Sequence, residues 1–106
     1  MKKIDLKEYI ENKKVLSGRE KGKNLRLRLK IDEEDNKEET VEINIPKEVF
    51  AFNSSYFLGL FGESVRKFGK DKFLEKYKFI CTNIIMLNIL DGIEDALNNV
   101  DLLGGE

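Results

Sequence analysis

A chain of 106 residues is long enough for one domain with its own hydrophobic core and too short for two. Hydrophobic residues make up 41% and charged residues 37%, so we expect a folded protein with a well-solvated surface. The net charge of −1 excludes a generally basic protein of the DNA-coating kind.

Cys81 is the single cysteine, so no internal disulfide can form, which fits a reducing compartment. The first 14 residues contain no apolar segment followed by a cleavage site, so no signal peptide is predicted. The longest apolar stretch, residues 84–90, is far too short to span a membrane. We therefore expect a cytoplasmic protein without membrane contact.

Charge is distributed unevenly along the chain. Residues 1–30 hold 11 Lys or Arg against 4 Asp or Glu, whereas residues 31–48 hold 2 against 8. The two segments could form a bipolar binding surface, but we favour their pairing with each other across neighbouring strands, because opposite charges stabilise sheets.

The first half of the chain predicts a β-hairpin. Residues 5–12 could form a short helix that begins with a capping box at Asp5, although Ile4 and Leu6 also alternate as in a strand. Residues 17–24 are polar and contain glycines, which predicts a loop. Residues 25–31 and 40–45 alternate apolar and polar side chains, so we expect two antiparallel strands joined by a charged loop over 32–39. Leu27, Leu29, Val41 and Ile43 should be buried.

The second half predicts helices and one more strand. Apolar residues with helical spacing run from Ser54 to Phe68, and Gly69 follows as a stop. We expect Phe57, Leu60, Phe61 and Val65 to pack onto the sheet. A short helical turn over 71–77, a buried strand over 78–82 and a helix over 83–99 come next. The face of that last helix consists of Ile85, Ile89, Ile93, Leu97 and Val100. Residues 100–106 should form a loose tail, and the whole is a single α+β domain over 1–106 with helices packed on a small mixed sheet.

The residues needed for common catalytic chemistry are missing. The chain has no histidine, which removes the commonest general base and metal ligand. Cys81 lies in a predicted buried strand, where a thiol is usually inert. Gly59 and Gly62 are spaced for close backbone packing and not for a phosphate loop. We expect no enzyme activity, no cofactor and no metal.

Three polar residues open the predicted helix at 54–68. Asn53, Ser54 and Ser55 are all good N-cap residues, because a short side-chain oxygen can accept a hydrogen bond from a first-turn amide. A helix start also attracts anions, so a phosphorylated Ser54 would be stabilised by free amides and by the helix dipole. We favour the capping role, with the surrounding backbone as part of a partner-binding surface.

The wider pattern resembles a known family. Its most specific parts are Gly18-Arg19 followed by Gly22, the Ser54-Ser55 pair with Tyr56 and Phe57, Gly62, and Asn83 at the start of the last helix. Over residues 17–98 the chain resembles the STAS-like family of small bacterial and phage proteins, fold relatives of the anti-sigma-factor antagonists. The resemblance favours a helix over residues 25–31, where the alternation of apolar and polar side chains indicates a strand.

In those antagonists a helix that begins Asp-Ser-Ser-Gly docks an ATPase-type serine kinase, and the first serine is phosphorylated. By position Ser54 matches that serine, so the resemblance implies a non-enzymatic regulatory module. Its partner would be an ATPase-type kinase, another regulator or a component of phage–host conflict. The expected binding or phosphorylation residues are Asn53, Ser54, Ser55, Tyr56, Gly18, Arg19 and Gly22.

The alternative function is nucleic-acid binding through outward-facing cations. Lysines and arginines on one strand face could contact phosphates. The cations concerned are Arg19, Lys21, Lys23, Arg26, Arg28 and Lys30. Against this, no aromatic residue lies among these cations to stack on bases, and the acidic segment that follows them would repel the nucleic acid. The exposed hairpin edge would also permit self-association.

Overall fold

Three parallel strands form the central sheet of the computed structural model, which describes residues 1–98. Their order is β1-β3-β5, with bounds β1 (Lys2–Asp5), β3 (Val41–Asn44) and β5 (Tyr77–Ile80). Ile43 at the centre lies opposite Ile4 on one side and Phe79 on the other. A second parallel pair joins β2 (Val15–Leu16) to β4 (Ala51–Phe52). Helical crossovers connect the strands, as parallel pairing requires.

The predicted antiparallel hairpin is wrong, and so is the mixed sheet that contained it. Residues 40–45 do provide a strand, β3, whose Val41 and Ile43 are fully buried as expected. Residues 25–31, however, are helical: they fall mainly in α1 (Arg19–Leu29), which ends at Lys30 with a left-handed φ of 56°. The neighbours of β3 are β1 and β5, and both run parallel to it.

The alternating leucines of α1 fit a helix as well as a strand. Leu25 and Leu29 lie one turn apart and are buried, while Leu27 is 71% exposed, so its predicted burial is wrong. The inward position between them along the helix is taken by Arg26, which is 7% exposed. The polar segment over 17–24, predicted as a loop, supplies the first turns of the same helix.

Two further local predictions need correction. The charged segment over 32–39 is not simply a solvated loop, because α2 (Ile31–Asp35) occupies its first part and buries Glu34 and Asp35. Asp5 does cap a helical turn by accepting a hydrogen bond from the Lys7 amide, but that turn is a short 3-10 helix, η1 (Leu6–Glu8). The preceding residues form strand β1.

The helices of the second half form where they were predicted, but the strand predicted as buried over 78–82 is β5 (Tyr77–Ile80), in which only Tyr77 is buried and Ile80 is 50% exposed. The helix α3 (Ser54–Phe68) has the predicted bounds, with Gly69 just after it, and α4 (Lys70–Lys76) and α5 (Asn83–Asn98) follow in the expected places. The predicted inward residues are all fully buried, namely Phe57, Leu60, Phe61, Val65, Ile85, Ile89 and Ile93. Leu97 is 40% exposed, and Val100 and the predicted tail lie outside the described residues.

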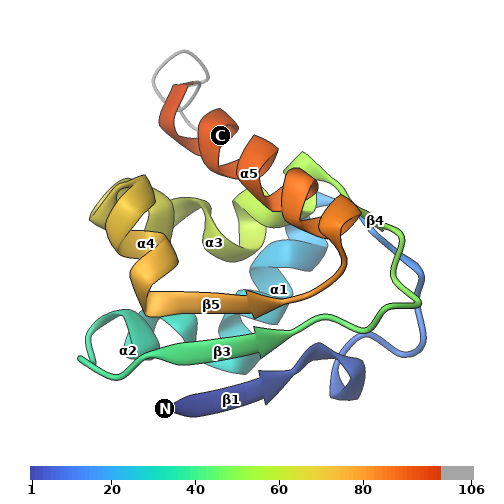
Figure 1. Ribbon diagram of the computed structural model, residues 1–106, viewed down its shortest axis with the longest axis horizontal. Coiled ribbons are helices and arrows are strands. Elements are labelled where there is room, and N and C mark those ends of the chain that lie inside the picture. The colour runs from blue at the N-terminus through green and yellow to red at the C-terminus, as the bar shows by residue number, and fades with distance from the viewer. Residues whose placement is uncertain (99–106) are drawn as a thin grey trace.

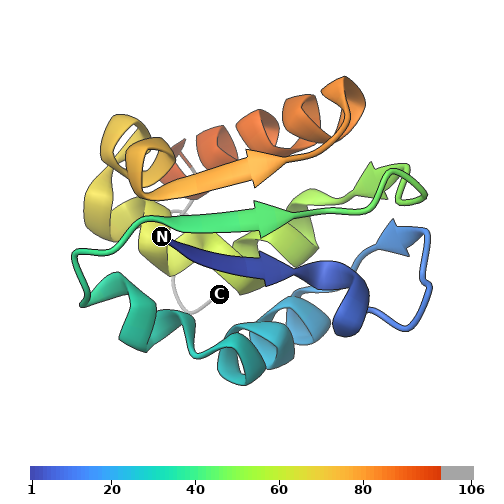
Figure 2. The same cartoon turned by 60° about the horizontal axis from the view of Figure 1, so that its bottom comes forward.

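The helices and the sheet form two layers. In Figures 1 and 2 the strands lie to one side of α1 and α3, so the helices cover one face of the sheet. That inner face carries Tyr77 and Phe79, which pack with Phe61 and Phe73 at ring-centroid distances of 5.1 to 6.1 Å. The polar residues of the strands face the other way, and there the Asn44 amide donates to Asp5. Within residues 1–98, no helix combines the length and apolar character needed to cross a bilayer.

Candidate functional site

The starts of α1 and α3 lie side by side because they continue two paired strands. Leu16 of β2 is in register with Phe52 of β4, and the chain enters a helix within three residues of each. The amide of Asn53 donates to the carbonyl of Leu16 over 2.8 Å. The parallel pairing therefore brings residues 17–22 and 53–56 together, although residues 23–52 lie between them in sequence.

Two glycines allow the helices to cross in backbone contact. A Cβ placed on Gly22 would lie 2.2 Å from the carbonyl oxygen of Tyr56, and one on Gly59 would lie 2.2 Å from that of Arg19. Both distances are far below van der Waals contact, so a side chain at either position would force the helices apart. The prediction of close backbone packing is confirmed for Gly59, whereas the nearest atoms to a Cβ on Gly62 belong to the side chains of Arg66 and Leu58.

The predicted serine cap is wrong. Asn53 occupies the N-cap position of α3, with φ −71° and ψ 152°, and its side chain makes no capping hydrogen bond. Ser54 is the first helical residue and is half-buried. The exposed Ser55 turns its hydroxyl away from the first turn and accepts a hydrogen bond from the Gly18 amide at 3.2 Å. The first turn of α3 thus lacks a side-chain cap and keeps the partial positive charge of a helix N-terminus.

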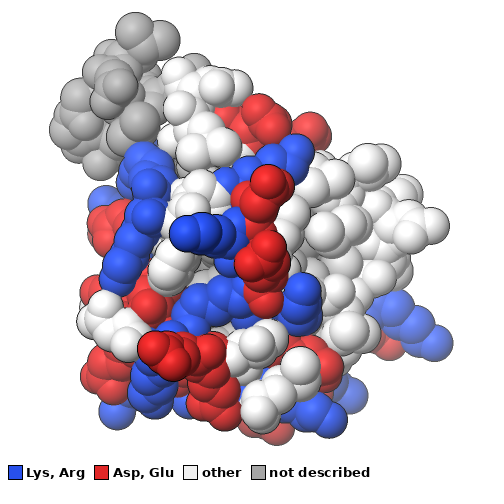
Figure 3. All heavy atoms as spheres, turned by 60° about the vertical axis from the view of Figure 1, so that its left-hand side comes forward, with Lys and Arg blue, Asp and Glu red and all other residues white. Residues whose placement is uncertain are grey.

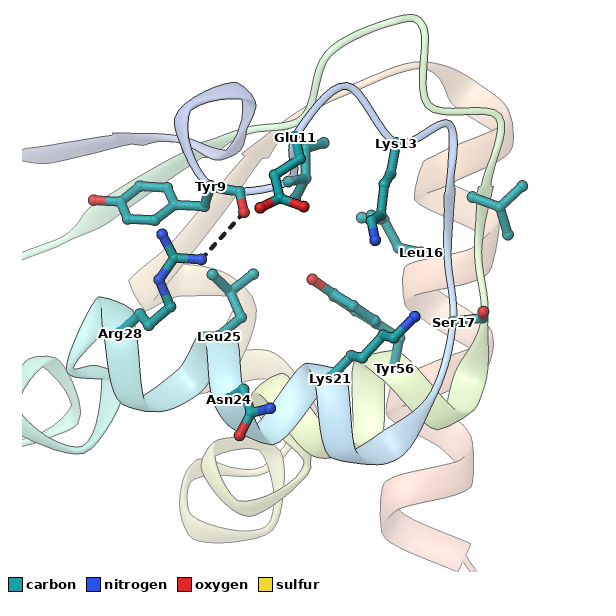
Figure 4. Close-up of a pocket in the computed structure, with 12 residues that line it drawn as sticks. Tyr9, Glu11, Lys13, Leu16, Ser17, Lys21, Asn24, Leu25, Arg28 and Tyr56 are labelled. Carbon is teal, nitrogen blue, oxygen red and sulfur yellow. Dashed lines mark hydrogen bonds between the residues drawn. The ribbon is translucent and has the colours of Figure 1, made fainter.

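Tyr56 lies beneath this surface and not on it. Its side chain is 6% exposed, and its ring packs edge-on against Phe52 at a centroid distance of 5.6 Å. The hydroxyl points into a cavity beside α1 (Figure 4). Of the expected partner-binding residues, Asn53, Ser54 and Ser55 are therefore the ones that face solvent at the start of α3.

Apolar side chains are exposed next to the same helix start. Phe50, three residues before Asn53, is 63% exposed. Ile84 and Leu87 are each 62% exposed and share one side of α5 with Asn88, whose side-chain oxygen accepts from the Phe52 amide at 2.9 Å. The first turns of α5 therefore border β4 and the start of α3 (Figure 1). The sequence did not predict these exposed apolar side chains, because periodicity alone does not distinguish exposed from buried apolar positions.

A buried polar cluster was also missed. The Asp35 carboxylate accepts from the hydroxyls of Tyr77 and Ser64 at 2.5 and 2.6 Å and from Arg26 at 3.2 Å. Arg26 also donates to Asp32, to Ser64 and to the carbonyl of Leu60. Burial, reinforced by the hydrogen bond to Asp35, raises the pKa of Tyr77 well above its usual value. Because the groups of the cluster bond one another, we assign it a structural role.

The basic start and the acidic segment do pair, but not across strands as predicted. Lys2 of β1 bonds Glu34 of α2 at 2.7 Å, and Arg26 of α1 pairs with Asp32 and Asp35. Burial acts to raise the pKa of Glu34, but the hydrogen bond and charge of Lys2, with help from Lys37, outweigh it and hold that pKa below its ordinary value. The same bond raises the pKa of Lys2.

The six cations of the alternative function do not form the predicted stripe. Arg26 is buried in the polar cluster, and Arg28 lies over the Tyr9 ring at 5.2 Å and donates to the Tyr9 carbonyl. Lys21 and Lys23 project from different sides of α1, as their spacing of two requires. The face that carries α2 and α4 shows cations and carboxylates interspersed (Figure 3). These cations therefore do not form one continuous basic surface.

Few side chains in the described part of the chain have the environment of a catalytic group. Cys81 is a free thiol whose pKa is raised by burial, which disfavours the reactive thiolate. No three metal-ligating side chains gather within residues 1–98. Comparisons with protein-family models, with curated proteins and with solved structures find no match to this chain.

Proposed function

We propose that this chain is a non-enzymatic, protein-binding regulatory module whose recognition surface is the start of α3. The observation that carries the proposal is the uncapped first turn of α3, where Asn53 makes no capping bond and Ser54 and Ser55 are accessible. These polar groups sit on a rigid support, because the glycine-mediated crossing fixes α3 against α1. An accessible feature on a rigid frame suits recognition, since little ordering is required on binding.

The exposed apolar residues beside the helix start support a protein partner. Phe50, Ile84 and Leu87 present large side chains to solvent around the polar residues of the first turn. Aromatic anchors surrounded by polar groups are typical of protein interfaces. In this proposal Phe50 inserts into the partner, and the amides and hydroxyls of the first turn supply the polar contacts.

The resemblance to the STAS-like family suggests the kind of partner. By that resemblance the surface docks an ATPase-type kinase or another regulatory protein, and Ser54 is the candidate phosphate acceptor. A phosphate on Ser54 would lie at the positive end of α3, near its first-turn amides. Asn53 stands where the antagonists have Asp, and Tyr56 stands where they have Gly. The Tyr56 ring is directed into the cavity, and Ser54 is half-buried.

Site-specific photocrosslinking in the source cells tests the proposal. A photoreactive residue at position 54 or 50 should give one and the same crosslinked protein from both positions. The matched control is position 78, since Lys78 is exposed on the strand face that the helices leave open. Loss of the position-50 adduct in Ser54→Asp would add specificity. Adducts that appear equally from position 78, or from neither test position, would refute the assignment.

A further inference from the structure

A cavity of about 220 Å³ lies between α1 and the segment that joins β1 to β2. Figure 4 shows α1 along one side, the segment around Tyr9, Glu11 and Lys13 along the other, and Tyr56 at its base. Apolar side chains line its interior, namely Ile10, Val15, Leu16 and Leu25. The volume is below the range of roughly 300 to 1,000 Å³ for drug-sized ligands, so the cavity suits a molecule with about one ring.

The wall opposite α1 is held in place by the backbone. Glu11 and Asn12 both adopt left-handed conformations, with φ values of 55° and 62°, which turn the chain sharply after η1. The carbonyl of Lys14 accepts from the Phe50 amide, and the carbonyl of Tyr9 accepts from Arg28. These bonds tie the segment to β4 on one side and to α1 on the other, so the cavity is formed before any ligand enters.

Tyr56 turns toward the cavity a hydroxyl that has no hydrogen-bond partner in the described part of the chain, while its ring is buried. Its side chain is 6% exposed, yet its hydroxyl makes no hydrogen bond to residues 1–98 and points into the cavity. Burial raises the pKa of Tyr56, while nearby Arg28 acts to lower it, so the group keeps its proton at neutral pH and can donate. A hydroxyl so placed leaves a donor unused unless solvent or a ligand accepts from it.

The charged groups around the cavity favour an anion. Lys13, Lys21 and Arg28 line it against the single carboxylate of Glu11. Neither lysine has an ion-pair or hydrogen-bond partner within the described residues, and both ammonium groups lie near the cavity in Figure 4. Asn24 lies on the same side of α1 as Lys21 and Arg28 and adds an amide donor. Three cations against one carboxylate match a ligand that carries two negative charges.

We infer that this cavity binds a small phosphate monoester with an apolar body of about one ring. The body contacts Ile10, Leu16 and Leu25, and the phosphate accepts hydrogen bonds from Tyr56 and Lys21. The inference goes beyond the docking proposal, because Ser54 and Phe50 do not line the cavity and the two sites can fail separately.

Titration with phenyl phosphate, followed by amide chemical shifts, tests the inference. We expect saturable shifts in residues 9–28 and at Tyr56, with a Kd of the order of 1 mM or tighter. Inorganic phosphate, which lacks the apolar body, should bind at least about fivefold more weakly. Tyr56→Phe should fold with unchanged stability, since the hydroxyl has no described partner, and should weaken binding roughly 3- to 10-fold.

Charge variants complete the experiment. Lys13→Gln combined with Lys21→Gln should weaken phenyl phosphate binding about tenfold or more, whereas the matched control Lys78→Gln should leave it unchanged. Ser54→Asp should also bind phenyl phosphate like the wild type, which separates this site from the docking surface. Shifts that do not saturate, equal binding of inorganic phosphate, or wild-type affinity in Tyr56→Phe would each overturn the inference.

Discussion

The crossing of α1 and α3 is open to a matched test with two glycines of the same helix. Gly59 and Gly62 both lie in α3 and are both buried. A Cβ on Gly59 would meet backbone, the Arg19 carbonyl oxygen at 2.2 Å and the Lys23 nitrogen at 2.8 Å. A Cβ on Gly62 would meet the end of the flexible Arg66 side chain at 3.3 Å. Only Gly59→Ala should therefore push the two helices apart.

The magnitude follows from the difference between the two variants. To restore ordinary contact at 3.4 Å from 2.2 Å, the Arg19 carbonyl must move by about 1.2 Å, and α1 moves with it. Such overpacking costs roughly 1 to 3 kcal/mol, and the upper part of that range applies because backbone cannot rotate aside. Each Gly→Ala change also gains about 1 kcal/mol of helix propensity. That gain cancels between the variants, so Gly59→Ala should be about 2 to 3 kcal/mol less stable than Gly62→Ala.

Urea denaturation followed by far-ultraviolet circular dichroism measures this difference. We expect a lower midpoint for Gly59→Ala than for the wild type, and an equal or higher midpoint for Gly62→Ala. Equal midpoints for the two variants would mean that α1 and α3 do not cross in contact at Gly59. The account of how residues 17–22 reach the start of α3 would then be refuted.

Three other predictions concern the core, the helix start and the buried ion pair. Phe61→Ala should destabilise by roughly 3 to 5 kcal/mol, because the ring is fully buried among aromatic neighbours; an unchanged urea midpoint would contradict that burial. Ser55→Ala should cost about 0.5 to 1 kcal/mol through the lost bond from Gly18, while Ser54→Ala should change stability by less than about 0.5 kcal/mol; the reverse order in thermal denaturation would show that Ser54 is the cap. Because the pKa of Glu34 is lowered on folding, its stabilisation is present above the ordinary glutamate pKa and lost as pH falls through the folded value. Lys2→Met should therefore reduce the acid-side loss of stability in a pH series of unfolding midpoints, and an unchanged profile would count against the pairing.

The sequence predicted the second half of the fold better than the first, for a physical reason. In α3 and α5 the apolar residues recur at i, i+3, i+4 and i+7, a pattern that a strand cannot place on one face. In α1 the leucines are Leu25, Leu27 and Leu29. Leu25 and Leu29 would lie on the same face of either a helix or a strand. The third inward position of the helix is Arg26, which pattern reasoning places outside because it is charged.

Other information in the sequence favoured the helix. Residues 19–29 contain no β-branched or aromatic residue, whereas β3 is built from Val41 and Ile43. The resemblance to the STAS-like family also favoured a helix over 25–31. The parallel order of the sheet could not be read from periodicity, since a four-residue strand such as β1 carries only two inward side chains.

The sequence correctly predicted that the glycines near the start of α1 lie beside the start of α3, but the predicted serine cap is wrong. Gly18, Gly22, Ser54 and Ser55 do come together, through the pairing of β2 with β4. That pairing joins two-residue strands, which are too short to give a sequence signal. The capping role failed because Asn53 already occupies the N-cap position, and the cavity around Tyr56 depends on left-handed residues that only the backbone reveals.

Binding of the crosslinked partner to Ser54 variants tests the central claim most directly. The purified partner would be titrated by calorimetry against the wild type, Ser54→Asp and the control Lys78→Gln, after thermal denaturation has shown that all three are folded. A carboxylate suits the start of α3, so Ser54→Asp should be as stable as the wild type or more so. We predict that Ser54→Asp binds the partner about tenfold or more weakly, through charge and desolvation at the interface, and that Lys78→Gln binds normally. Equal affinities for all three proteins would contradict the assignment of the start of α3 as the recognition surface.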